Sequence, residues 1–217
     1  MENMSSKIMS KVFLWMCIGL AVTFVTGRLI ANSPDAIEEI FTGNKVFILA
    51  IVEIVLVIWL SARIQKMSAT SAKILFILYS FVTGLTFSSI FIVYEISSII
   101  YVFLATSLIM LIFAMLGYFT KIDLTKLGTF LMMAIIGIII MAIINIFVGN
   151  EQFSIGLAIA SVVIFVGFIA FDVQKIKRMY ESNMIPEDNL AIYGALQLYL
   201  DFINIFIDLL RLFGRDN

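Results

Sequence analysis

Seven long apolar stretches constrain this chain more than any other feature. Each is close to the 20 or so residues that a helix needs to cross the roughly 30 Å hydrocarbon layer of a bilayer. Hydrophobic residues make up 62% of the 217-residue sequence and charged residues 13%, against roughly 45–50% and about 25% in soluble domains. The sequence therefore predicts an all-α membrane protein. The expected spans are Val12–Ile30, Val46–Ala62, Ile74–Tyr94, Ile99–Phe119, Leu127–Val148, Phe153–Phe171 and Leu190–Phe213.

The spans follow one another without a linker-like stretch, so we expect a single integral membrane domain over residues 1–217. The first span follows Lys7 and Lys11, as the apolar part of a signal peptide would. It lacks a cleavage site of small residues, and six more spans come after it. We therefore expect a retained helix.

Prolines and glycines indicate where the chain turns and where helices can approach closely. Pro34 and Pro186 lie in the two longer loops, where turns are expected. Gly117, Gly128 and Gly137 lie in or beside apolar spans, and small residues there usually permit close helix packing. No internal repeat is evident, so the sequence does not indicate an inverted-repeat transporter.

The charges of the connecting segments alternate, and this alternation predicts the orientation. The basic segments carry Lys7, Lys11, Arg63, Lys66, Lys73, Lys121, Lys126, Lys175, Lys177 and Arg178. The opposite segments are mainly acidic and carry Asp35, Glu38, Glu39, Glu95 and Glu151. The positive-inside rule predicts a multi-pass protein of the cell membrane with its N-terminus in the cytoplasm. Arg211 and Arg215 follow the last span, so a re-entrant last helix that keeps the tail inside is an alternative to a full crossing.

Several functional classes lack the residues that they need. The chain has no His, and its one cysteine, Cys17, cannot form an internal disulfide. Its net charge is −1 and it has no basic run, which excludes nucleic acid as an expected partner. Nucleotide-binding and serine-hydrolase motifs are missing as well. We expect no enzymatic activity and no cofactor, and any proton chemistry must fall to carboxylates.

Four carboxylates lie within or at the end of the expected spans: Glu53, Asp172, Asp201 and Asp208. An ionisable side chain at the centre of a membrane helix costs at least about 2.5–3.5 kcal/mol, so such residues usually face the bundle interior and mark a pathway. In the last span, Asp201, Asn204 and Asp208 are spaced i, i+3 and i+7 and fall on one helical face. A helix with such a polar stripe is suited to the centre of a bundle.

Ordinary structural roles also explain some of these acids. Asp172 is followed by polar residues and could be an interfacial residue at a helix end. Asp208 and Arg211 have the i, i+3 spacing of an ordinary ion pair, and we favour that role for Asp208. Asp201 has no basic residue within a helical turn. Asp201 is therefore the first functional candidate.

Glu53 could in principle pair with Arg63 at the end of the same span. At 1.5 Å per residue the two lie about 15 Å apart along one helix, so a direct ion pair is not expected. Glu53 is retained as a candidate pathway residue.

Three stretches carry a family resemblance: FDVQKI at Phe171–Ile176, LYLDFINIFIDLLRLFG at Leu198–Gly214 and GYFTKIDLTKLGTFL at Gly117–Leu131. At these residues the chain resembles the Bax-inhibitor family, also called the transmembrane Bax inhibitor motif family, and its small bacterial members most of all. The resemblance implies a seven-helix bundle in which six transmembrane helices surround a central last helix. It also implies a bacterial inner membrane.

The bacterial members are described as pH-sensitive calcium leak channels, in which two aspartates share a proton to close the pore. By motif these positions are Asp172 and Asp201. The resemblance makes Arg63 the nearest candidate for an arginine that exchanges partners with the pair. Asp208 stands where the family has Asn or a variable residue.

Physical chemistry gives the same expectation for the pair, because two carboxylates in a low-dielectric site resist ionising together. Ca2+ prefers several oxygen ligands at about 2.3–2.6 Å. The tentative set for the transported ion is Asp172, Asp201 and Glu53, with Asn204 as a further pathway candidate.

Three hypotheses follow for the function. The first is a passive cation leak channel, with Ca2+ and protons as its partners in a lipid bilayer. The second is a membrane-embedded regulator that binds another membrane protein, whose identity the sequence does not give. The third and weakest is an intramembrane aspartyl protease, because such enzymes normally have GxGD at the second aspartate, where this chain has LYLD at Leu198–Asp201.

Overall fold

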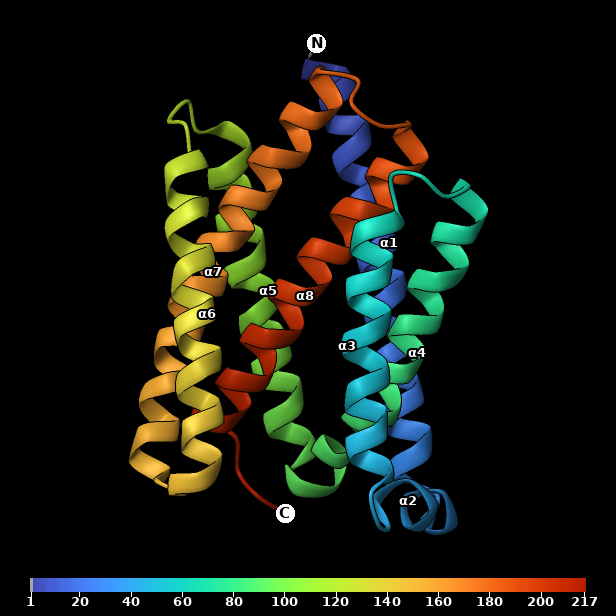
Figure 1. The fold of residues 1–217 in the computed structure, drawn as a ribbon, viewed down its shortest axis with the longest axis vertical. Coiled ribbons are helices and arrows are strands. Elements are labelled where there is room, and N and C mark those ends of the chain that lie inside the picture. Colours follow the sequence, from blue (N-terminus) through green and yellow to red (C-terminus); the bar gives the residue numbers. More distant parts are fainter. Residues whose placement is uncertain (1) are drawn as a thin grey trace. The chain divides into compact units, whose positions relative to one another are not determined.

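The computed structural model describes residues 2–217, with side chains from Ser5 onward. Eight helices make up this part of the chain (Figure 1). They are α1 (Glu2–Ala31), α2 (Pro34–Phe41), α3 (Lys45–Arg63), α4 (Ala69–Val93), α5 (Ile96–Phe119), α6 (Thr125–Val148), α7 (Glu151–Glu181) and α8 (Glu187–Phe213). All except α2 are long and apolar enough to cross a membrane. The predicted all-α membrane fold with seven spans is confirmed.

The predicted spans fall on the seven long helices, most of which continue beyond the apolar stretch. The largest difference is in α7, which continues to Glu181, well past the predicted end at Phe171. Hydropathy marks where the hydrocarbon layer ends, whereas backbone hydrogen bonding can carry a helix further into the interface. The sequence missed α2 because it was expected only as a turn. Pro34 occupies the first turn of α2, where a missing N–H costs nothing.

The helices group into two compact units by their contacts. The first consists of α1 to α4, residues 178–199 and Asn217. The second consists of α5, α6, most of α7 and residues 200–216. The helix α8 contributes to both units. It is also the most buried of the seven spans, with 78% of its apolar window inside the protein.

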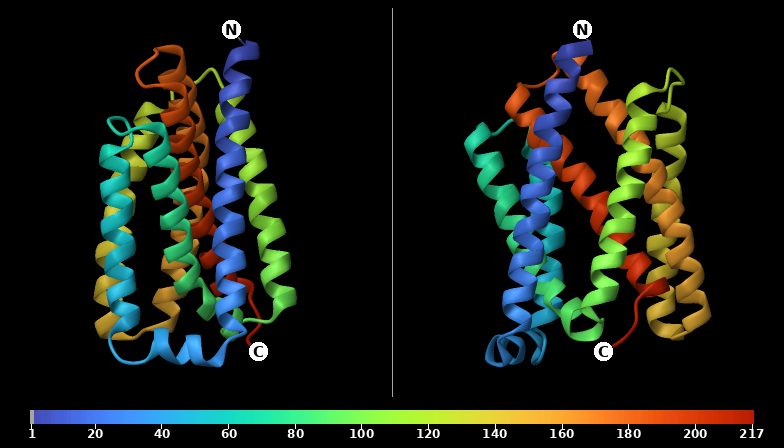
Figure 2. Two further views of the ribbon diagram at one scale, coloured as in Figure 1. Left: turned by 90° about the vertical axis from the view of Figure 1, so that its right-hand side faces the viewer. Right: turned by 180° about the vertical axis from the view of Figure 1, so that it is seen from behind.

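In the first unit, α1 packs along α4 (Figure 2). Gly84 permits this approach, because a Cβ atom there would lie 2.6 Å from Cβ of Thr26. A buried hydrogen-bond chain adds to the contact. The Thr23 hydroxyl donates to Ser80 O at 2.9 Å, and Tyr199 OH donates to Thr23 Oγ1 at 2.6 Å. Through Tyr199, α8 is joined to α1 and α4.

Tyr199→Phe should lower stability by about 1 kcal/mol, because it removes one buried hydrogen bond while it preserves the ring. Thermal unfolding in detergent measures the loss. Tyr101→Phe is the matched control, since Tyr101 is 73% exposed. An equal loss in both variants would show that the bond between Tyr199 and Thr23 makes no specific contribution.

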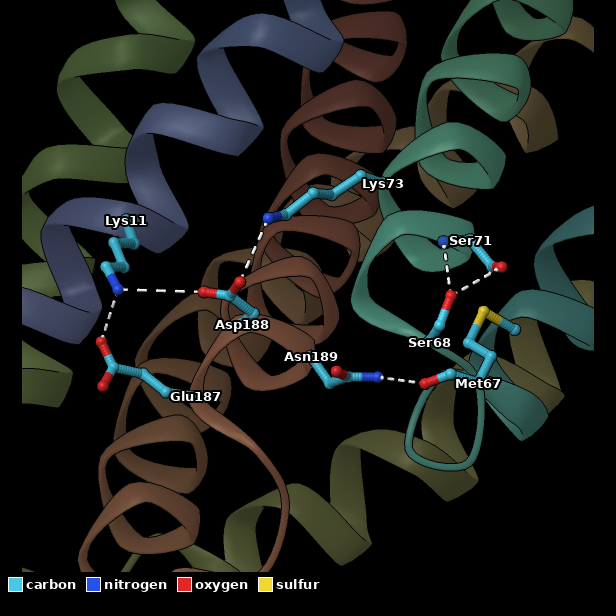
Figure 3. A network of polar contacts seen from close by, with 8 residues as sticks. All are labelled: Lys11, Met67, Ser68, Ser71, Lys73, Glu187, Asp188 and Asn189. Atoms are coloured by element: carbon cyan, nitrogen blue, oxygen red, sulfur yellow. Dashed lines mark hydrogen bonds and ion pairs between the residues drawn. The ribbon is translucent and has the colours of Figure 1, made fainter.

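Within the first unit, ion pairs and a backbone hydrogen bond connect the two ends of α4 to residues near the C-terminus. At the start of α4, Lys73 contacts Asp188 at 3.2 Å, next to the pair of Lys11 and Glu187 at 2.7 Å (Figure 3). At the far end of α4, Asn217 N donates to Val93 O at 2.9 Å. The 27 residues of α8 extend about 40 Å. A helix of that length is long enough for a full crossing, and the re-entrant last helix stays the alternative prediction.

Candidate functional site

In the second unit, α7 and α8 bring Asp172 and Asp201 together. The two side chains are buried, with exposed fractions of 5% and 4%. They are close enough that a negative charge on Asp172 acts directly on Asp201. Asp172 lies within α7, with nine further helical residues after it. The interpretation of Asp172 as an interfacial residue at a helix end is therefore wrong.

One oxygen of this pair has no partner. Asp201 Oδ2 is buried and forms no hydrogen bond within residues 2–217. A buried polar atom without a partner costs roughly 1–3 kcal/mol, and two ionised carboxylates in a low-dielectric site repel each other strongly. A proton held between the carboxylates, or a cation bound to both, would relieve both costs.

Two glycines allow neighbouring helices to pack closely against α7 beside Asp172. A Cβ atom on Gly117 would lie 2.2 Å from Ala170 O, and one on Gly128 would lie 2.3 Å from the Phe171 ring. Glycine is therefore required for α5 and α6 to approach α7 immediately before Asp172. The packing role predicted for these two residues is confirmed. For Gly137 it is wrong, because a Cβ atom there would meet nothing within 4 Å.

Gln174, two residues after Asp172, fastens α7 to the loop between α5 and α6. Its Nε2 donates to Ile122 O at 2.8 Å, and its Oε1 accepts from Leu124 N at 2.9 Å. Lys177 lies over the Tyr118 ring, with 4.8 Å between Nζ and the ring centroid. The stretches FDVQKI and GYFTKIDLTKLGTFL therefore contact each other, which gives a physical reason for their joint occurrence around Asp172.

Asn204 and Asp208 line a polar cavity of about 740 Å³ at the end of the second unit where α6 meets α7. Ser161 lines the same cavity as Asp208. The Asp208 carboxylate lies 3.9 Å from the Arg211 guanidinium, so the predicted ion pair is confirmed. The cavity extends along α8 to Asn204, which is less than one turn from Asp201. The remaining polar lining residues are Asn145, Asn150, Glu151 and Ser154.

Glu53 and Arg63 both belong to the first unit. Glu53 is half-buried and accepts a hydrogen bond from the Thr86 hydroxyl at 2.7 Å. Arg63 is exposed at the end of α3. No ion pair joins Glu53 and Arg63 in the described part of the chain, as expected from their spacing along α3.

No group of three or more His, Cys, Asp or Glu side chains is placed to hold a metal ion among the described residues. Glu53, the third residue of the predicted calcium set, belongs to the first unit, whereas Asp172 and Asp201 belong to the second. For the described residues this leaves the aspartate pair, on α7 and α8, as the centre of the site.

Sequence reasoning missed Thr86 and Gln174 as partners of the candidate acids and their helices. Hydroxyl and amide residues are common in membrane helices, so composition did not single them out. Gln174 carried a usable signal, because it lies within the FDVQKI stretch.

The fold and the site define a class: a helical, multi-pass membrane protein with a buried aspartate pair on its last two spans. The family described as Inhibitor of apoptosis-promoting Bax1 matches residues 5–217. The chain belongs to this Bax inhibitor family.

Bacterial relatives are similar over most of their length. The chain is 43% identical over 213 residues to the inner membrane protein YbhL of Escherichia coli K12, covering 95% of this chain and 91% of the relative. It is 37% identical over 216 residues to an uncharacterized protein of Borreliella burgdorferi, covering 97% and 92%. It is 38% identical over 169 residues to an uncharacterized membrane protein of Streptococcus pyogenes, covering 77% and 73%. These relatives support a membrane location.

Proposed function

We propose that this protein is a pH-sensitive cation leak channel, with Ca2+ as the transported ion and its N-terminus in the cytoplasm. The observation that carries the proposal is the buried pair of Asp172 and Asp201, whose Oδ2 atom on Asp201 has no partner in the described part of the chain. If Asp201 had a purely structural role, we would expect a Lys or Arg side chain beside that oxygen.

The pair supplies a switch without histidine. When Asp172 and Asp201 share one proton, a hydrogen bond holds α7 and α8 together and the site carries one negative charge. When the proton leaves, the two carboxylates repel and their oxygens become ligands of the kind that Ca2+ prefers. Flux should therefore rise as the pH rises through the titration of the pair.

The polar cavity beside Asn204 and Asp208 supports this proposal by offering a hydrated approach along α8. Asn204 lines the cavity and lies three residues from Asp201, so this end of the cavity is within one helical turn of Asp201. Asp208 already has a cationic partner in Arg211, at 3.9 Å. We therefore assign Asp208 to the approach and not to the switch.

Calcium uptake into liposomes tests the proposal. Purified protein is reconstituted with a calcium-sensitive dye inside the vesicles, and uptake is recorded at a series of pH values against protein-free vesicles. The proposal predicts uptake above the protein-free level that increases with pH. Uptake equal to that of empty vesicles at every pH would exclude it.

A further inference from the structure

A second cavity, in the first unit, differs in character from the aspartate site. It has a volume of about 380 Å³ and lies where α3 ends and α4 begins. We call it the basic pocket; its lining residues are Trp59, Arg63, Lys66, Met67, Ser71 and Leu75. We propose that the basic pocket binds the phosphate group of an anionic phospholipid. This inference is independent of the proposed channel function.

The two cations of the basic pocket have no carboxylate partner among the residues that the structure describes. Within the described part of the chain, Arg63 and Lys66 form no ion pair, whereas Lys11, Lys73 and Arg211 each contact a carboxylate. Among the described side chains, from Ser5 onward, none of the residues that line the pocket is acidic. A concave surface with two uncompensated positive charges attracts an anion, and a guanidinium matches phosphate geometry in particular.

The backbone of the pocket is held in one shape. The buried amide of Asn189 donates to Ile64 O at 2.6 Å. It also donates to Met67 O at 2.9 Å (Figure 3). Arg63 O accepts from the backbone N–H groups of Lys66 and Met67 at 2.8 and 3.1 Å. The loop that carries both cations is therefore preorganised, which reduces the entropy cost of binding a ligand.

The surroundings favour a lipid over a free phosphate ion. Only 6% of the apolar window of α3 is buried, so α3 presents an apolar surface on which acyl chains can lie. Exposed Ile58 on α3 and Ile74 on α4 adjoin the pocket in sequence. Trp59 is 47% exposed, and Trp is enriched at the membrane interface. A phospholipid matches both the cations and the apolar surface, because its phosphate can contact Arg63 and Lys66 while its acyl chains lie along the helices.

Trp59 also provides the readout. The chain has two Trp residues, so Trp15→Phe leaves Trp59 as the single reporter inside the pocket. In this background the protein is reconstituted in phosphatidylcholine vesicles with increasing amounts of brominated phosphatidylglycerol, whose bromine atoms quench Trp fluorescence on contact. Brominated phosphatidylcholine serves as the neutral comparison. We expect phosphatidylglycerol to quench Trp59 at a much lower mole fraction.

Charge removal identifies the site. The double variant Arg63→Gln with Lys66→Gln should abolish the preference for phosphatidylglycerol over phosphatidylcholine. Each lost cation should lower the affinity for phosphatidylglycerol roughly fivefold, and both together about 25-fold. The matched control is Lys121→Gln with Lys126→Gln, which removes the same charge from another segment on the predicted cytoplasmic side. A preference that survives the first double variant, or falls equally in both, would overturn the proposal.

Competition with inorganic phosphate shows whether the pocket binds the phosphate group of a lipid or a free phosphate ion. Added to the aqueous phase, it should leave the quenching by phosphatidylglycerol unchanged if the pocket takes the lipid. Displacement of the lipid by millimolar phosphate would show a site for the free ion and would overturn the lipid assignment. Asn189→Ala keeps both charges and loosens the loop, so it should weaken the preference by less than the double charge variant.

Discussion

Asp201→Asn should leave a calcium flux that no longer changes with pH. One shared proton lets the wild-type flux change by up to about tenfold per pH unit, since one pKa unit corresponds to about 1.36 kcal/mol. An amide at position 201 cannot ionise. The site in this variant therefore cannot change from one negative charge to two when the pH rises. Liposome uptake measured over a pH series gives the result directly.

Asp208→Asn is the matched control for that experiment. Asp208 lies on the same helix and lines the polar cavity, but its carboxylate lies 3.9 Å from the Arg211 guanidinium. An asparagine there removes the charge and keeps the shape of the side chain. We expect Asp208→Asn to keep the pH response. A pH response lost in Asp208→Asn and kept in Asp201→Asn would reverse the roles given to these residues.

Gly117→Ala should be the most destabilising single-methyl addition in the second unit. The new Cβ atom would lie 2.2 Å from the Ala170 backbone oxygen, which cannot rotate away as a side chain can. Overpacking costs about 1–3 kcal/mol and occasionally more, so a fall of roughly 5–10 °C in melting temperature is expected. Thermal unfolding in detergent measures this change.

Gly137→Ala is the control, because a Cβ atom at Gly137 meets nothing within 4 Å. Its melting temperature should be unchanged or slightly higher, since Ala favours a helix over Gly. If Gly117→Ala were as stable as Gly137→Ala, the contact between α5 and α7 would be looser than described. The support of Asp172 by that contact would then be in doubt.

The number and type of the elements were predictable because a bilayer allows only one solution for long apolar stretches. In lipid, backbone groups must be satisfied within the segment, so each stretch forms a helix. Helix ends were less predictable, as α7 shows. Its hydropathy falls at Asp172, yet its backbone bonding continues to Glu181. That difference decided whether Asp172 is an interfacial or a buried residue.

The site was predictable in part. The cost of charge in a membrane selected four acids, with Asp201 as the first candidate, and the family resemblance paired Asp201 with Asp172. Helical spacing predicted the pair of Asp208 and Arg211. Spacing within one helix carries no information on partners from other helices. The bond from Thr86 to Glu53 and the role of Gly117 therefore emerged only from tertiary packing.

The protonation of the aspartate pair is the central claim, and infrared spectroscopy of the reconstituted protein tests it most directly. On acidification, the wild type should gain the C=O stretching band of a buried, protonated carboxyl group over the same pH range in which calcium flux falls. Asp208→Asn should keep this band, and Asp201→Asn should lose it. A wild type without a titrating carboxyl band, or a band unaffected by Asp201→Asn, would contradict the shared proton.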